Sequence, residues 1–199
     1  MILSENVDSF GIPLAEKLVL KAWEEYASKV SDAYQARPMV ESEYVSSWKA
    51  LIAHVERMFE QMKSRIEVEF VDEDPYKSEA EVSADIRDNK RLKIYSGGTS
   101  HPIWTPEQNL KFRAYHDYLS HFSGGHQFGL KGEIAAYNQH MKMCPKEGQL
   151  ALFTEIIGQA STAEKTGKFP PQKICKLHGF DYVNVGKMDE QEYEKNFLK

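Results

Sequence analysis

Apolar residues recur every three or four positions along the first third of the chain, a pattern typical of amphipathic helices. A first helix that begins near Pro13 is predicted by apolar residues four apart: Leu14, Leu18, Ala22 and Tyr26. A second helix over residues 42–65 is predicted by a longer set with the same spacing: Trp48, Leu51, Ile52, Val55, Met58, Phe59 and Met62. Pro38 lies between the two patterns and marks a break.

The pattern changes to alternation in the middle of the chain. Residues 66–71 alternate apolar and acidic side chains, and residues 91–95 alternate again. Both segments therefore predict short strands, which we expect to pair as a small sheet. Between them, Ser78 and Glu81 have the spacing of a capping box, which predicts a short helix over residues 78–89.

Helical patterns return in the second half of the chain. Thr105 and Pro106 are typical of a helix start, and we expect this helix to end near Phe122. Two further helices, over about residues 129–143 and 148–163, are predicted by apolar periodicity bounded by glycine and proline.

These elements indicate a mainly α fold, a helical bundle with a small two-stranded β element around residues 66–95. The length of 199 residues suits one domain, and we predict a single domain over residues 1–199. We divide it into four parts: N-terminal helices (1–65), a small β and turn insertion (66–104), a helical core with the polar site (105–180) and a tail (181–199) that can either dock through its apolar side or fray.

Composition and charge exclude several classes of protein. Lys and Arg total 25 against 30 Asp and Glu, a net charge of -5, which argues against a broadly basic nucleic-acid-binding protein. No stretch approaches the roughly 20 apolar residues of a membrane span, and residues 1–10 lack the basic start and apolar core of a secretion signal. Cys144 and Cys175 form no disulfide framework and are interpreted as free thiols. We therefore expect a cytoplasmic protein with no membrane partner.

Polar and ionisable residues interrupt the apolar pattern on each helix of the second half. The first helix has four of them near one face: Arg113, His116, Asp117 and either Ser120 or His121. The second has a stripe at spacings of four and three: Glu133, Tyr137 and His140. The third has Glu155 and Gln159, four apart between apolar neighbours, where a carboxylate buried without a partner would cost several kcal/mol. His126 falls in a glycine-rich segment and is interpreted as a loop residue.

Imidazoles and carboxylates on facing helices are the ligand types of a metal site in a helical bundle. The predicted ligands of a divalent metal (Mn, Zn, Fe or Mg) are His116, His121, Glu133, Glu155 and His140. Asp117, Glu133 and Arg113 are the candidate catalytic residues, and Arg113, Gln159 and Tyr137 are the candidate substrate-binding residues. The alternative interpretation is structural, because Arg113 and Asp117 also have the spacing of an ordinary helix ion pair.

The same residues resemble a known family. The chain contains Phe112-Arg113-Ala114-Tyr115-His116-Asp117-x-x-x-His121, Gly132-Glu133-x-x-Ala136-Tyr137 and Thr154-Glu155-x-x-Gly158-Gln159. Over about residues 45–177, these runs are similar to an uncharacterised helical domain of bacteriophage proteins and mobile-element polyproteins. Tyr137 stands where that family usually has tryptophan, and Ile156-Ile157 where a Thr-Arg pair is common. The resemblance implies a phage or mobile-element origin and marks the same site, but it implies no reaction.

Three functions are compatible with these patterns. The first is a metal-dependent hydrolase acting on a phosphorylated small molecule or nucleotide, in which a carboxylate takes a proton from metal-bound water. The second is a non-enzymatic phage factor that binds a host protein, with the polar set as a structural hydrogen-bond network. A di-metal carboxylate oxidase is a minor alternative, because neither Glu133 nor Glu155 is followed by histidine three residues later. Whether the chain is an enzyme stays open at this point.

Overall fold

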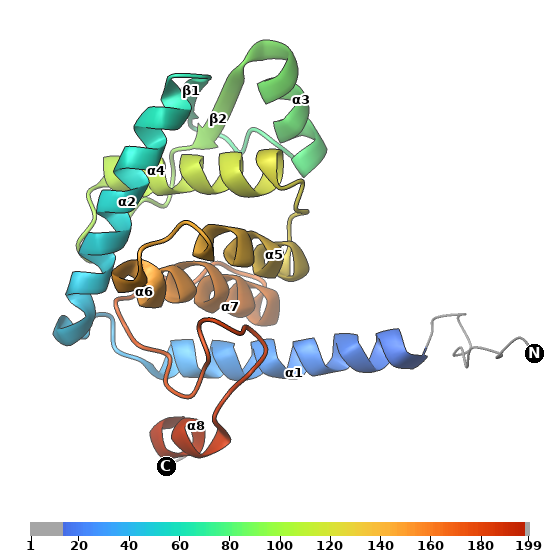
Figure 1. Cartoon of the computed structure of the whole chain (residues 1–199), viewed down its shortest axis with the longest axis vertical. Coiled ribbons are helices and arrows are strands. Elements are labelled where there is room, and N and C mark those ends of the chain that lie inside the picture. The colour runs from blue at the N-terminus through green and yellow to red at the C-terminus, as the bar shows by residue number, and fades with distance from the viewer. Residues whose placement is uncertain (1–13, 198–199) are drawn as a thin grey trace, which may run out of the picture.

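The computed structural model describes residues 14–197 and has the predicted mainly α fold with a small two-stranded sheet (Figure 1). The main elements are α1 (Leu14–Ala36), α2 (Val45–Lys63), β1 (Glu67–Val71), α3 (Glu79–Asn89), β2 (Arg91–Tyr95), α4 (Pro106–His116), α5 (Leu130–Met141), α6 (Gln149–Phe153), α7 (Gln159–Thr166) and α8 (Glu190–Phe197). Short segments complete them: 3-10 turns η1 (Ser42–Tyr44) and η3 (Lys146–Gly148), and π-helical segments η2 (Asp117–Ser123) and η4 (Thr154–Gly158). Pro13 and the segment 1–10 discussed above lie outside the described residues.

Both predicted N-terminal helices are confirmed. In α2 the predicted apolar stripe is buried except for Met58, which is half-buried. α1 ends at Ala36, before the break predicted at Pro38, and a lysine from a distant loop caps its end. The Lys173 Nζ donates hydrogen bonds to three backbone carbonyls: Tyr34 (2.9 Å), Gln35 (3.1 Å) and Arg37 (2.5 Å). A cation there complements the negative end of the helix dipole.

The predicted small sheet is confirmed as well, and its two strands are parallel. Parallel neighbours need a crossover connection, which α3 provides. Ser78 caps α3 as predicted, since its hydroxyl accepts a hydrogen bond from the Glu81 backbone N–H at 3.4 Å. Leu92 and Ile94 of β2 are buried in a small apolar core with residues of α2, α3 and α4. This unit therefore packs against the helices through one face of β2.

Two helices of the second half contain a π-helical segment. α4 continues directly into η2, and α6, η4 and α7 follow one another without a break. The helices predicted over residues 105–122 and 148–163 are thus confirmed in position, and Thr105 forms a capping box with Gln108 at the start of α4. Because a π-helix bonds residue i to i+5, it changes which side chains share a face, and such segments are frequent at functional sites.

The helices pack as layers around the main apolar core. Figure 1 shows α4, α5, α7 and α1 as successive layers, with α2 running across one end of them. The core includes the fully buried side chains of Trp48, Tyr137 and Phe153. The tail docks through its apolar side, since Tyr193 of α8 is buried against Phe180. Within residues 14–197, no helix combines the length and the apolar character needed to cross a membrane.

Candidate functional site

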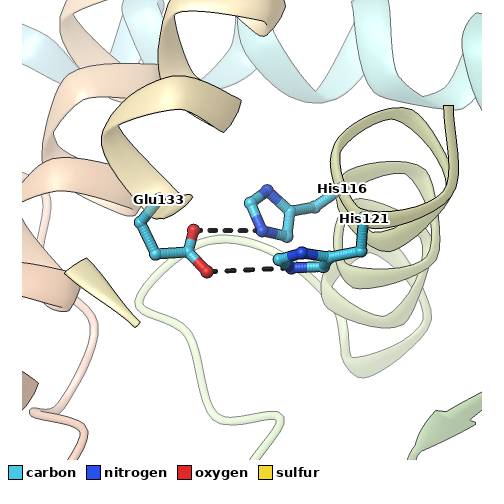
Figure 2. A group of neighbouring side chains, drawn as sticks. All are labelled: His116, His121 and Glu133. Atoms are coloured by element: carbon cyan, nitrogen blue, oxygen red, sulfur yellow. Dashed lines mark ion pairs between the residues drawn. The ribbon is translucent and has the colours of Figure 1, made fainter. Parts of the chain in front are cut away.

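Three of the predicted metal ligands lie together where the end of α4 and η2 face the start of α5. The ligand atoms of His116, His121 and Glu133 all lie within 4.8 Å of one another. Glu133 Oε2 is 3.2 Å from His116 Nε2, and Glu133 Oε1 is 3.7 Å from His121 Nε2 (Figure 2). The side chains of Glu133 and His116 are 20% and 15% exposed, whereas that of His121 is 2% exposed. Parts of the Glu133 and His116 side chains are therefore in contact with solvent, whereas His121 is enclosed.

The π-helical segment η2 brings the two histidines together. His116 is the last residue of α4, and His121 lies five residues later in η2. In an α-helix, residues five apart point about 140° away from each other, because each residue turns the chain by about 100°. In a π-helix a spacing of five returns to the same face, and the two ring centroids lie 5.2 Å apart. The prediction grouped these residues by the α-helical spacings of three and four, which do not explain why His116 and His121 lie together. No local sequence signal marks the π-helical segment.

His121 is anchored through the ring nitrogen that faces away from Glu133. Its Nδ1–H donates a hydrogen bond to the backbone carbonyl of His126 at 2.7 Å, which leaves Nε2 as the lone-pair nitrogen beside Glu133. The His126 ring donates in turn to Gln139 Oε1 at 2.9 Å. His126 is a loop residue as predicted, but its carbonyl and its partner Gln139 are site residues that the sequence analysis missed. Only the closeness of His126 to His121 in sequence hinted at them.

Two glycines shape the approach of this loop to α5. Gly129 precedes α5 with a φ of 93°, a left-handed conformation that side chains other than glycine rarely adopt. Gly132, in the first turn of α5, lies against the loop, and a Cβ at this position would overlap the carbonyl oxygen of Gln127. The Gly132-Glu133 pair of the sequence motif thus has a physical basis: the glycine lets the loop approach the helix that carries Glu133.

His116 is held by ring contacts. Its ring stacks on that of His140 at 5.3 Å with an interplanar angle of 1°, and it lies beside Phe112. Its Nδ1 is buried with no hydrogen-bond partner among the described residues. His140, a predicted ligand, lies next to the ligand cluster but outside it, and its Nε2 is 3.0 Å from the Ser120 hydroxyl. In the structure, His140 therefore packs against the His116 ring and contributes no ligand atom to the cluster.

His116 and Glu133 shift each other's pKa as the partners of an ion pair do. Burial alone would lower the pKa of His116, but the Glu133 carboxylate outweighs it and raises the pKa above the ordinary histidine value. Burial alone would raise the pKa of Glu133, but His116 and then His121 hold it below its ordinary value. Burial and the charge of His116 lower the pKa of His121, and burial lowers that of His140 well below the usual range. His116 and Glu133 therefore each favour the charged form of the other.

Asp117 borders this cluster. Its Oδ1 is 4.0 Å from His121 Nε2, and its side chain is 28% exposed, the most open of the group. Burial, and after it the charge of Glu133, raise the pKa of Asp117 to about 6. The predicted catalytic carboxylate therefore lies at the open edge of the ligand cluster.

Arg113 has other partners than the predicted substrate anion. Its guanidinium donates hydrogen bonds to three backbone carbonyls at the end of β2 and in the loop after it: Tyr95 (3.1 Å), Gly97 (2.6 Å) and Gly98 (2.5 Å). Arg113 thereby fixes the glycine-containing loop onto α4. This structural role differs from the one expected for it.

Glu155 does not join the predicted ligand cluster. Its side chain is 0% exposed and its carboxylate forms the centre of a second polar cluster, where it accepts hydrogen bonds from four side chains: Trp48 (2.6 Å), His101 (3.1 Å), Gln159 (2.5 Å) and Gln172 (2.9 Å). The His101 Nδ1 accepts the backbone N–H groups of Ile103 and Trp104, so its Nε2 carries the proton that Glu155 receives. Because nitrogen donors surround Glu155, it needs no metal to be stable in the interior.

The two remaining predicted binding residues also belong to the interior. Gln159 is bound to Glu155, as described, and Tyr137 is fully buried. The Tyr137 hydroxyl donates to the Tyr182 carbonyl at 2.7 Å, and its ring lies edge-on to that of Phe153. The structure therefore gives both residues internal partners.

No family model, curated protein or solved structure matches this chain. The resemblance to a bacteriophage and mobile-element domain therefore stays a prediction.

Proposed function

We propose that this protein binds one divalent transition-metal ion through His116, His121 and Glu133 and uses it to activate water for hydrolysis. The observation that supports this proposal is the meeting of two imidazoles and one carboxylate within 4.8 Å, from two different helices. The anchoring of His121 Nδ1 on a backbone carbonyl adds to it, because metal-bound histidines usually donate their other ring N–H in this way.

The ligand set favours zinc or a similar borderline metal. Imidazole nitrogens suit Zn²⁺, Fe²⁺ and Mn²⁺, whereas Mg²⁺ prefers oxygen ligands and water. Three protein ligands leave a coordination position for water, which distinguishes catalytic zinc sites from closed structural ones. The cluster contains one carboxylate among the described residues, whereas a di-metal carboxylate oxidase needs several bridging ones. A mononuclear hydrolytic site is therefore the better proposal.

The chain supplies two further functions to such a site. A bound cation lowers the pKa of its water toward 7 and so provides hydroxide at neutral pH. Asp117, whose Oδ1 lies 4.0 Å from His121 Nε2 at the open edge of the cluster, would accept the proton of that water. Because Arg113 is bound to backbone carbonyls, the metal itself is the group that would hold an anionic oxygen of the substrate. A phosphorylated small molecule or nucleotide remains our proposed substrate class.

Metal analysis tests this proposal first. Protein purified without chelator is analysed by inductively coupled plasma mass spectrometry, before and after dialysis against Zn²⁺, Mn²⁺ or Fe²⁺. We expect one ion per chain in the wild type and less than a tenth of that in His116→Ala and Glu133→Gln. His178→Ala is the matched control, because the partly buried His178 ring is bound to Glu192, away from the cluster, and its loss should leave the stoichiometry unchanged. A wild-type protein that takes up none of these metals refutes the proposal and favours the host-protein-binding alternative.

The metal-loaded protein is then assayed with phosphomonoesters and nucleotides. Release of inorganic phosphate that requires the metal and is lost in Asp117→Asn supports the hydrolase. Metal-bound protein that consumes oxygen with Fe²⁺ but releases no phosphate contradicts hydrolysis and assigns the same ligand set to an oxygenase.

A further inference from the structure

We propose that Gln139 is a positioning residue for the metal site, and that it acts on the ligand His121 through the loop residue His126. This inference rests on the proposed metal site. Among the described residues, the Gln139 side chain forms its hydrogen bond with His126 and none with His116, His121 or Glu133. Its effect runs through two hydrogen bonds, from His126 Nε2–H to Gln139 Oε1 (2.9 Å) and from His121 Nδ1–H to the His126 carbonyl (2.7 Å).

The loop between η2 and α5 is held by a small set of contacts: the Phe128 ring lies edge-on to the His121 ring at 4.6 Å, the Gln127 carbonyl packs against Gly132, and the His126 ring bonds Gln139. It contains Gly125 and Gly129 with φ angles of 63° and 93°, so its backbone is intrinsically free to adopt many conformations. The His126 backbone N–H donates to the Ser120 carbonyl at 3.1 Å, which fixes one side of the peptide. The bond between the His126 ring and Gln139 fixes the loop on the other side, against α5.

We call the two hydrogen bonds that link Gln139, His126 and His121 the relay. The position of Gln139 on α5 explains how the relay can position a metal ligand. Glu133 lies in the first turn of the same helix, six residues before Gln139. One rigid helix therefore holds a metal ligand directly and, through Gln139 and His126, the partner of a second ligand on η2. Gly124 fits this arrangement, because a Cβ there would overlap the Gln139 side-chain oxygen. The relay keeps His121 in the tautomer whose Nε2 lone pair faces Glu133, and loss of such partners typically weakens metal binding by about 10–100-fold.

The test measures metal affinity and the His121 tautomer in five variants, four single and one double. Gln139→Leu removes the acceptor, and Gln139→Glu restores it with a carboxylate oxygen. Asn138→Leu is the matched control on the exposed neighbouring position of α5. The dissociation constant for Zn²⁺ is obtained by competition with a chromophoric chelator, the Co²⁺ complex is followed by its visible absorption, and the tautomer of His121 is read from ring ¹⁵N shifts in metal-free protein.

We expect Gln139→Leu to weaken Zn²⁺ binding about 10–100-fold, to change the Co²⁺ spectrum and to reduce the Nδ1–H tautomer of His121. Gln139→Glu should bind within about threefold of the wild type, and Asn138→Leu should equal it. His126→Leu keeps the carbonyl but frees the loop, so it should weaken binding similarly. The double variant should be no weaker than either single one, because both remove the same link.

The outcomes separate this inference from the proposed function. Wild-type affinity in a folded Gln139→Leu protein, or additive losses in the double variant, overturns the relay and leaves the metal site standing. If Gln139→Leu does not fold, His126→Leu and its ¹⁵N shifts decide the same question. A wild-type protein that binds neither Zn²⁺ nor Co²⁺ overturns the proposed function, and this inference with it.

Discussion

Removal of the Glu155 carboxylate should destabilise the protein strongly without affecting metal uptake. Glu155→Leu puts an apolar side chain of similar size in place of the carboxylate and so removes the acceptor of four nitrogen donors. The donors of Gln159 and Gln172 are partly exposed and can turn to water. The Trp48 Nε1–H and the His101 Nε2–H are enclosed, since the Trp48 and His101 side chains are 0% exposed.

The magnitude follows from these two donors. A buried donor left without a partner costs about 1–3 kcal/mol, so two of them cost about 2–6 kcal/mol. Removing one partner of a buried charged network costs about 3–5 kcal/mol by comparison. We therefore expect Glu155→Leu to lower the free energy of unfolding by about 4 kcal/mol. Glu155→Gln keeps an oxygen for Trp48 and His101, and the two glutamine amides can turn their oxygens toward its new N–H₂ group, so it should cost about 1 kcal/mol.

Urea unfolding followed by circular dichroism and tryptophan fluorescence measures both variants, with equal m-values as the check on two-state behaviour. The Trp48 indole proton, resolved by NMR, should shift upfield in Glu155→Leu, because it loses a hydrogen bond of 2.6 Å to a carboxylate. A loss below about 1 kcal/mol in Glu155→Leu, or equal losses in the two variants, would refute this reasoning. If folded Glu155→Gln binds less metal than the wild type, Glu155 is instead one of the metal ligands.

Three further predictions concern the loop, the thiols and the cap of α1. Gly132→Ala should abolish metal uptake by displacing the Gln127 carbonyl, as measured by metal analysis of folded protein. Burial raises the pKa of Cys144 and of Cys175 to about 12. At pH 8 both thiols should therefore react with iodoacetamide at least about 1000-fold more slowly in the folded protein than in urea, because the thiolate fraction falls tenfold per pKa unit. Equal rates in the folded and the unfolded protein would contradict burial. Lys173→Met should cost about 2 kcal/mol in urea unfolding, because three carbonyls lose a charged donor; an unchanged midpoint would show that water replaces it.

The helices and strands were predictable because each buries one face. Periods of three to four and of two are direct consequences of that burial, and α2 with its stripe from Trp48 to Met62 shows this plainly. The parallel direction of the strands was not predicted, although the intervening helix α3 is the connection that such pairing needs. Local capping signals were reliable for Ser78 and Thr105 because their partners lie three residues away.

The site was predictable in its members but only partly in its grouping. His116, His121 and Glu133 were singled out as polar residues in apolar surroundings, and the structure brings them together. Glu155 had the same signature, yet its donors Trp48 and His101 lie 107 and 54 residues away in sequence. Periodicity indicates that a carboxylate is buried, and the cost of burial implies that it has a partner. Neither indicates which residue the partner is. Only the folded arrangement separates a metal ligand from the acceptor of a nitrogen cluster.

The π-helical segment η2 has a consequence for how this site tolerates changes in chain length. Its turn bonds residue i to i+5, one residue more than the i to i+4 turn of an α-helix. Deleting one residue between His116 and His121 would let the backbone close as a regular α-helix and would leave the histidines four apart. That is the spacing at which an α-helix places two histidines on one face for zinc. A comparison of distant relatives should therefore allow a gap of one position here while keeping both histidines aligned.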